Sequence, residues 1–276
     1  MSALTKEYPI DIHPSKKIDM STLAETLKNA DNIDGLEPID INSPEHLKHY
    51  FANGAYVREM ALPANTAVVG RIHKHETINI LLEGEITVVD ESGARTDFKA
   101  PHVFIAPAGN QKAALTKTPV RWLNSWACDT TDPDEAIDLL TCETMEEYNL
   151  FLDAEDVKSL TDELGHTKDS MRKLVSTNDV IYKAQRNIYI SGSNIDGFGV
   201  FPRRSFKKDD FIAEMRCGEN RTVAGRYTNH SLNPNSRPMF VNGVLSLVSI
   251  TDIAQNQEVT CNYRDVLDCR EEQGDL

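Results

Sequence analysis

Short apolar runs separated by turn residues constrain the first half of the chain more than any other feature. Strand-like runs recur from Ala55 to Asp129, and Gly, Pro and Asn residues interrupt them. Gly93 marks a hairpin turn within this region, and PVRWLNSWACD over residues 119–129 is the last predicted strand. Many short strands at regular spacing, without helical periodicity between them, are typical of a small β-sandwich or barrel.

Helical patterns flank this predicted β domain. Residues 21–29 predict a short helix with Ser21 as its N-cap. The SPE sequence at 43–45 predicts a second helix that runs to Ala52, because Pro is favoured at the first helical position. Residues 131–180 are helical in character and begin with acidic residues, which suits the positive end of a helix dipole. We expect these residues to form a connector to a second domain.

Composition excludes several classes of partner. The net charge of −14 argues against duplex nucleic acid, whose phosphates select basic surfaces. No run approaches the roughly 18 apolar residues of a membrane span, and the N-terminal sequence lacks the apolar core of a signal peptide. The five cysteines are scattered without a C-x-x-C pair, as expected of reduced thiols. We therefore expect a cytoplasmic protein with no nucleic-acid or membrane partner.

A polar segment with apolar runs on both sides marks the candidate site. It is RYTNHSLNPN, Arg226 to Asn235. IDGFGVF lies upstream at 195–201, and QEVTCNY lies downstream at 257–263. Ordered polar loops between strands often carry binding and catalytic groups. In this order and within about 70 residues, the three motifs resemble the SET domain of protein-lysine methyltransferases, and the resemblance covers residues 187–268.

The resemblance implies a cofactor, a substrate and a set of site residues. The cofactor is S-adenosyl-L-methionine, and the substrate is a lysine side chain of another protein. Tyr263 matches the catalytic tyrosine, whose phenol is protonated at neutral pH and positions the amine. Glu258 is expected to orient local backbone. The residues matched to cofactor binding are Phe198, Gly199, Tyr227, Asn229 and His230.

Two departures from the SET pattern keep a second reading open. Only 27 residues, 202–228, separate Phe201 from Asn229, so the insert that forms one wall of the substrate groove is missing. No cysteine cluster follows the last motif, where Cys269 stands alone. The alternative to the enzyme is a non-catalytic binding or structural protein that keeps a shortened SET scaffold.

The predicted β domain has a resemblance of its own. HKHETINILLEGEITV and the region around PAGNQKAAL resemble the two motifs of the cupin barrel. The region is also similar to cupin-like proteins of tailed phages, which would make the compartment the host cytoplasm. Cupin barrels tend to pair, so the resemblance implies a homo-oligomer assembled through this domain, which would serve assembly or substrate recruitment.

Histidines within the cupin-like region raise the question of a metal. His73 and His75 have a spacing that puts both side chains on one face of a strand. Gln111 lies where the later histidine of the second motif is expected, and His102 is a third donor only if the fold brings it near. Imidazole sites normally need three or more protein donors, so no metal is predicted. A cupin enzyme with a degenerate SET-like tail would need that third ligand.

The expected fold is mainly β with a helical connector. A cupin-like β-barrel or sandwich precedes a short SET-like β fold. The expected domains are 1–130 (cupin-like, with a helical lead-in), 131–180 (connector), 181–268 (SET-like) and 269–276 (acidic tail).

Overall fold

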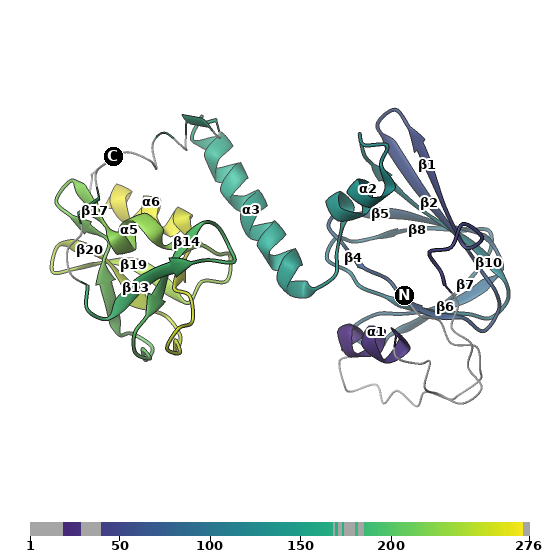
Figure 1. Cartoon of the computed structure of the whole chain (residues 1–276), viewed down its shortest axis with the longest axis horizontal. Helices are drawn as coiled ribbons and strands as arrows, with labels where there is room; N and C mark the ends of the chain where they lie inside the picture. The colour runs from purple at the N-terminus through teal and green to yellow at the C-terminus, as the bar shows by residue number, and fades with distance from the viewer. Residues whose placement is uncertain are drawn as a thin grey trace. The chain divides into compact units, whose positions relative to one another are not determined.

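The computed structural model of the chain divides into two compact units, Met1–Tyr148 and Asn149–Leu276 (Figure 1). The structure describes residues 19–28, 40–167, 169–170, 173, 180–181 and 185–272. Strands predominate in both units, which confirms the mainly β prediction. Across these described ranges, no helix combines the length and apolar character needed to cross a bilayer.

Two antiparallel sheets form the N-terminal unit. The first has the order β1-β2-β10-β5-β8, with bounds Leu47–Ala52, Ala55–Leu62, Val120–Ala127, Thr77–Glu83 and His102–Ala106. The second has the order β3-β9-β6-β7, with bounds Ala67–Val69, Ala113–Thr116, Glu85–Val89 and Arg95–Lys99. One apolar cluster unites Leu81 and Trp122 of the first sheet with Ile86 and Val88 of the second. This two-sheet arrangement is the sandwich that the spacing of the strands predicted.

Alternating burial explains why these residues form strands. Along β10 every second side chain from Val120 to Trp126 is buried, as expected for a strand with one face toward the core. The chain changes sheet between β5 and β6 at Gly84, whose φ is +88°. A Cβ at Gly84 would lie 2.2 Å from the carbonyl oxygen of Pro119, so only glycine allows this close crossing.

The helical predictions for the N-terminal region are partly wrong. Helix α1 (Met20–Lys28) forms, but Asp19 caps it instead of Ser21, since the amide of Thr22 donates to Asp19 Oδ1 at 3.2 Å. The predicted helix at 43–52 is wrong, because β1 occupies 47–52 and pairs with β2. Pairing with a neighbouring strand overrides the local preference for a proline-initiated helix.

The predicted connector 131–180 contributes to both units. Helix α2 (Pro133–Leu140) packs on the N-terminal unit, where β11 (Thr141–Cys142) pairs with β4 (Ile72–His73). Helix α3 (Met145–Glu163) contains the boundary between Tyr148 and Asn149.

The C-terminal unit is built from several small sheets. β13 (Ile188–Gly192) and β14 (Phe198–Pro202) form a hairpin. The other sheets are β15-β20-β19 (Phe211–Glu214, Val244–Ser249, Ser236–Val241), β12-β17-β16 (Val180–Ile181, Asn220–Thr222, Arg216–Cys217) and β18-β21 (Asn229–His230, Thr260–Cys261). Helices α5 (Val223–Tyr227) and α6 (Tyr263–Glu272) complete the unit (Figure 1). Val200, Phe206, Ile212, Leu247 and Val259 are buried together in its core.

Candidate functional site

A short parallel pair of strands brings two of the three sequence motifs together. In β18 and β21, Asn229 pairs with Thr260 and His230 with Cys261. The segment that follows β18 is tied to β21 as well. The side chain of Asn235 donates to the carbonyl of Glu258 at 2.7 Å and accepts from the amide of Thr260 at 3.0 Å. The polar segment is therefore held in place by hydrogen bonds to a stretch about 25 residues later in the chain.

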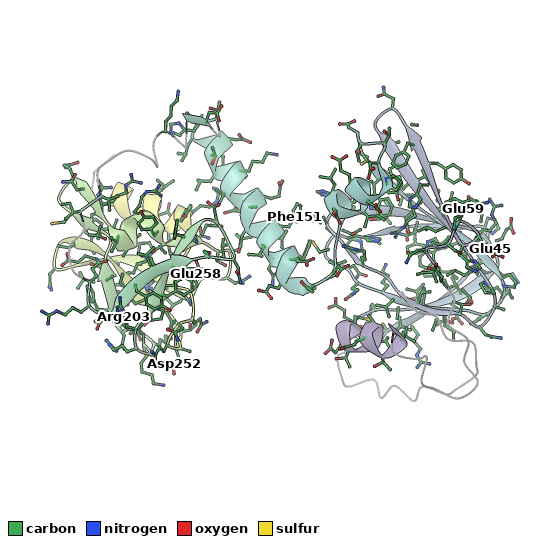
Figure 2. The ribbon with its side chains drawn as sticks, viewed as in Figure 1. Glu45, Glu59, Phe151, Arg203, Asp252 and Glu258 are labelled. Carbon is green, nitrogen blue, oxygen red and sulfur yellow. The ribbon has the colours of Figure 1, made fainter. Side chains whose placement is uncertain are left out.

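The third motif joins this pair through a polar network around Glu258, whose side chain is labelled in Figure 2. Asn229 Nδ2 lies 2.7 Å from Glu258 Oε1 and 3.0 Å from Ser193 Oγ. It also lies within 3.3 Å of the carbonyl oxygens of Asp196 and Phe198. A carboxamide has only two protons to donate, so Asn229 shares them among these acceptors and holds the loop before β14 against β18.

Ser193 completes the network and was not predicted from the sequence. Its hydroxyl lies 2.8 Å and 2.9 Å from the two carboxylate oxygens of Glu258. The amide of Ile195 donates to the same hydroxyl at 2.9 Å. The only sequence signal was its place just before the glycine-containing motif, which any loop serine would share.

The structure gives Gly199 a definite steric role. A Cβ at this position would lie 2.1 Å from Glu258 Oε1 and 2.6 Å from its Cδ. The absence of a side chain at Gly199 therefore makes room for the carboxylate of Glu258. Gly197 differs, because its φ is +48° and nothing lies within 4 Å of where its Cβ would be.

Aromatic side chains form the exposed edge of the candidate site. The ring of Phe198 is 60% exposed and meets the ring of Tyr227 edge-on, with 6.3 Å between centroids. The guanidinium of Arg226 lies 5.3 Å from the centroid of the Tyr227 ring. Aromatic surface and open backbone at Gly197 thus lie at one edge of the polar network.

Tyr263 begins α6 directly after this region, and its contacts keep it neutral. Its hydroxyl donates to the carbonyl of Thr228 at 3.1 Å, and its ring meets that of His230 edge-on at 5.2 Å. Burial raises the pKa of the Tyr263 phenol well above its ordinary value, and the nearby Cys261 and Asp196 raise it further. The phenol is therefore a neutral hydrogen-bonding group at physiological pH.

His230 is buried, and a hydrogen bond at Nδ1 orients its ring. Its Nδ1 accepts a hydrogen bond from the amide of Tyr263 at 3.2 Å, so the neutral ring carries its proton on Nε2. Nε2 lies 3.3 Å from Asp156 Oδ2. Burial lowers the pKa of His230 below its ordinary value, although the charges of Asp153 and Asp156 act in the opposite direction.

Helix α3 supplies acidic side chains to the same segment. Asp153 Oδ1 accepts from the amide of Leu232 at 2.7 Å. Asp156 lies 3.4 Å from Arg264 Nε, and Glu163 pairs with the same guanidinium at 2.7 Å. These three acids were not predicted from the sequence, although their spacing of three and seven residues places them on one face of a helix and was a usable signal.

The histidines of the N-terminal unit are not brought together. β4 ends at His73, so the expected shared strand face does not form and that prediction is wrong. His73 and His75 line different cavities, and His102 packs on Phe98 with 4.8 Å between ring centroids. Among the residues that the structure describes, no group of three or more His, Cys, Asp or Glu side chains is arranged to hold a metal.

Comparison with known proteins identifies one sequence family. Residues 216–264 match the family model for the SET domain, which confirms the resemblance over that segment. This family is one of methyltransferases, and the match contains Tyr227, Asn229, His230 and Tyr263. No curated protein matches the chain.

Solved structures similar to the chain include cupin proteins. A cupin-2 domain protein from Shewanella frigidimarina is 11% identical over 32% of this chain and 84% of its own, with a TM-score of 0.27. An RmlC-like cupin family protein from Methanocaldococcus jannaschii is 11% identical over 32% of this chain and 85% of its own, with a TM-score of 0.28.

Proposed function

We propose that the C-terminal unit is an S-adenosyl-L-methionine-dependent protein-lysine N-methyltransferase. The pairing of β18 with β21 carries the proposal. It assembles residues 195–199, 229–230 and 258–263 around one polar network, although they are far apart in the sequence. The match of residues 216–264 to the SET domain supports the same reading.

The residues at the edge of this network fit the cofactor. A sulfonium cation is attracted to aromatic faces, and the exposed ring of Phe198 lies beside Tyr227. The open space at Gly197 lets a ligand approach the backbone closely. Phe198, Gly199, Tyr227, Asn229 and His230 would hold S-adenosyl-L-methionine, the last two mainly by fixing the backbone around it.

Tyr263 would position the lysine that receives the methyl group. When bound, the cofactor supplies an electrophilic methyl group on sulfur, which is transferred to the neutral lysine nitrogen and leaves S-adenosylhomocysteine. The phenol of Tyr263 donates its proton to the carbonyl of Thr228, so its oxygen lone pairs remain free to accept a hydrogen bond from the amine. A phenolate at this position would favour the protonated, unreactive form of the amine. The raised pKa of Tyr263 prevents this, because it keeps the phenol neutral.

Titration calorimetry with S-adenosyl-L-methionine and S-adenosylhomocysteine tests the cofactor site without knowledge of the substrate. We expect stoichiometric binding to the full chain, weakened at least tenfold by Phe198→Ala. Phe211→Ala is the matched control, because Phe211 is another exposed phenylalanine on a strand of the same unit. Wild-type protein that binds neither ligand would contradict the proposal.

A second candidate is a binding scaffold without catalysis. Only 27 residues, 202–228, separate Phe201 from Asn229, which leaves little chain to form a wall of a substrate groove. Methyl transfer from labelled cofactor distinguishes the two readings. The enzyme predicts transfer to a lysine-containing protein that Tyr263→Phe slows at least tenfold while cofactor affinity is kept, and the scaffold predicts no transfer.

We propose further that the N-terminal unit forms a homo-oligomer. Ile78, Val103 and Ile105 are 46%, 61% and 65% exposed. They lie on β5 and on β8, which is the edge of its sheet, and Ile78 pairs directly with Ile105. An exposed apolar row on an edge strand favours association with a second copy. We also propose a cytoplasmic location, because none of the five cysteines, all within the described ranges, forms a disulfide.

A further inference from the structure

The N-terminal unit contains two adjoining cavities that none of the functions above uses. The inner cavity, of about 60 Å³, lies between the sheets and is lined by Trp122, Asn79 and Lys112, among others. The outer cavity, of about 570 Å³, reaches α1 and includes the carboxylates of Glu25 and Glu143 in its lining. Both are lined by Arg58, Met60, Gly70 and Arg71, so they adjoin along these residues, and we treat them as one candidate site. The outer volume lies within the range typical of small-molecule sites.

Arg58 is the feature of this site that requires an explanation. Arg58 is only 7% exposed, and its Nε has no hydrogen-bond partner among the described residues. Nη2 donates to the neutral side chain of Asn124 at 3.2 Å, and the guanidinium lies 5.3 Å from the centroid of a Trp126 ring. Burial of a cation is costly unless it is paired and fully hydrogen-bonded.

No carboxylate in the described part of the chain forms an ion pair with Arg58. The acid beside it in sequence, Glu59 (labelled in Figure 2), lies on the other face of β2, since neighbouring strand residues point to opposite faces, and it pairs with Arg121 at 2.8 Å. Burial lowers the pKa of the Arg58 guanidinium; Tyr56 acts in the opposite direction, and Arg71 lowers the pKa further. The guanidinium nonetheless stays protonated at physiological pH. The fold thus places an unneutralised positive charge at the junction of the two cavities.

Neighbouring groups extend the same chemistry. Arg71 Nε and His73 Nδ1 are buried and have no hydrogen-bond partner among the described residues. Lys112 lines the inner cavity, and burial lowers the pKa of its ammonium. Burial, together with the charges of Arg58 and Lys112, lowers the pKa of His73 to about 4. At neutral pH the site therefore combines arginine and lysine cations with a neutral imidazole.

We propose that this site binds a small organic anion, with the Arg58 guanidinium as the anchor of its carboxylate or phosphate head. A planar guanidinium pairs with either oxyanion through two parallel hydrogen bonds, and Nε is available for one of them. Lys112 adds positive charge at the head, whereas the charge of Arg71 is already paired with Glu143 at 3.0 Å. Met60 and Trp122 present apolar surface to the body of the ligand. Binding of the anion supplies the counter-charge that the protein itself lacks.

The test uses intrinsic fluorescence of the full chain, because Trp122 lines the inner cavity and Trp126 contacts Arg58. The probes are benzoate, phenyl phosphate, the neutral analogue benzamide, and inorganic phosphate. We expect saturable fluorescence changes and a raised melting temperature with benzoate or phenyl phosphate, at least tenfold weaker binding of benzamide, and weaker binding of inorganic phosphate. The preference between benzoate and phenyl phosphate identifies the head group.

Two substitutions at Arg58 and one control decide the role of the cation. Arg58→Met should abolish the response to the anions without lowering the melting temperature of the free protein, because it removes an unpaired buried charge. Arg58→Lys should weaken anion binding about tenfold, since lysine keeps the positive charge but lacks the planar pair of N–H donors. Arg121→Met, on the opposite face of the sheet, should bind as the wild type does. Anion binding that survives Arg58→Met, or a wild type unresponsive to every anionic probe at 10 mM, would overturn the proposal.

Discussion

Substituting Gly199 by alanine tests whether the polar network holds the candidate site together. The new Cβ would lie 2.1 Å from Glu258 Oε1, 2.6 Å from Cδ and 3.2 Å from Cγ. Contacts this short are not tolerated, and the clashing atoms belong to a flexible side chain. We therefore expect the carboxylate of Glu258 to rotate away and β14 to keep its backbone.

The cost follows from the hydrogen bonds that this rotation breaks. Glu258 loses the hydrogen bonds that it accepts from Ser193 Oγ at 2.8 Å and from Asn229 Nδ2 at 2.7 Å. Hydrogen bonds to a charged group contribute roughly 1.5–3 kcal/mol each. Glu258 is half-buried, so water replaces part of this loss. We expect Gly199→Ala to lower the free energy of unfolding of the C-terminal unit by about 2–4 kcal/mol, a decrease in Tm on the order of 10 °C.

The assay must report on the correct unit. Both tryptophans, Trp122 and Trp126, lie in the N-terminal unit, so their fluorescence does not follow this transition. Calorimetry and hydrogen exchange of residues 193–199 and 257–262 follow it directly. Gly192→Ala is the matched control, because Gly192 pairs with Phe198 in the same hairpin and nothing lies within 4 Å of its Cβ position. Its effect should stay within about 0.5 kcal/mol.

A double-mutant cycle separates the steric argument from a general effect of the new methyl group. Glu258→Ala loses the same hydrogen bonds and also removes the atoms that the alanine meets. Gly199→Ala should therefore cost little in the Glu258→Ala background, which gives a coupling energy of about 2 kcal/mol. Additive costs, or a Gly199→Ala protein as stable as the wild type, would refute the reasoning.

Three further predictions concern both units. The pKa of His73 is about 4 in the folded chain and about 6.5 in the unfolded chain, so between these pH values only the unfolded chain binds the proton. The free energy of unfolding should therefore fall by about 3 kcal/mol from pH 6.5 to pH 4. In urea titrations followed by tryptophan fluorescence, His73→Gln should reduce this dependence on pH. Asp153→Ala removes the acceptor of the Leu232 amide, so it should lower the free energy of unfolding by about 1–3 kcal/mol and speed hydrogen exchange at that amide. Glu155→Ala, at an exposed position of the same helix, should change neither quantity. Ile105→Lys should reduce the mass measured by light scattering to that of a monomer, and an unchanged mass would remove β8 from the interface.

Local patterns predicted the parts of the fold that depend on local chemistry. Alternation along residues 120–127 predicted a strand because one face of that strand is buried. The hairpin turn at Gly93 was predicted from a glycine that adopts a φ of +82° in the structure. The three motifs predicted one site because each retains the small or polar residues that such a site requires.

Long-range pairing decided what the sequence could not predict. Residues 47–52 carry a helix start signal before them, yet they become a strand because β2 offers a full antiparallel register. Likewise, the structure places the side chain of Glu258, which lies 59 residues later, where a side chain at Gly199 would otherwise lie. Neither partner can be read from the sequence around the residue concerned.

The side chains of Asn229 and His230 are suited to their positions by charge state as well as by shape. Asn229 donates to a carboxylate at 2.7 Å, so an aspartate here would bring two negative charges together. His230 accepts from the amide of Tyr263, which requires an Nδ1 without a proton. Protonation would set two N–H groups against each other at the start of α6. The burial that lowers the pKa of His230 therefore also preserves the hydrogen bond that positions Tyr263.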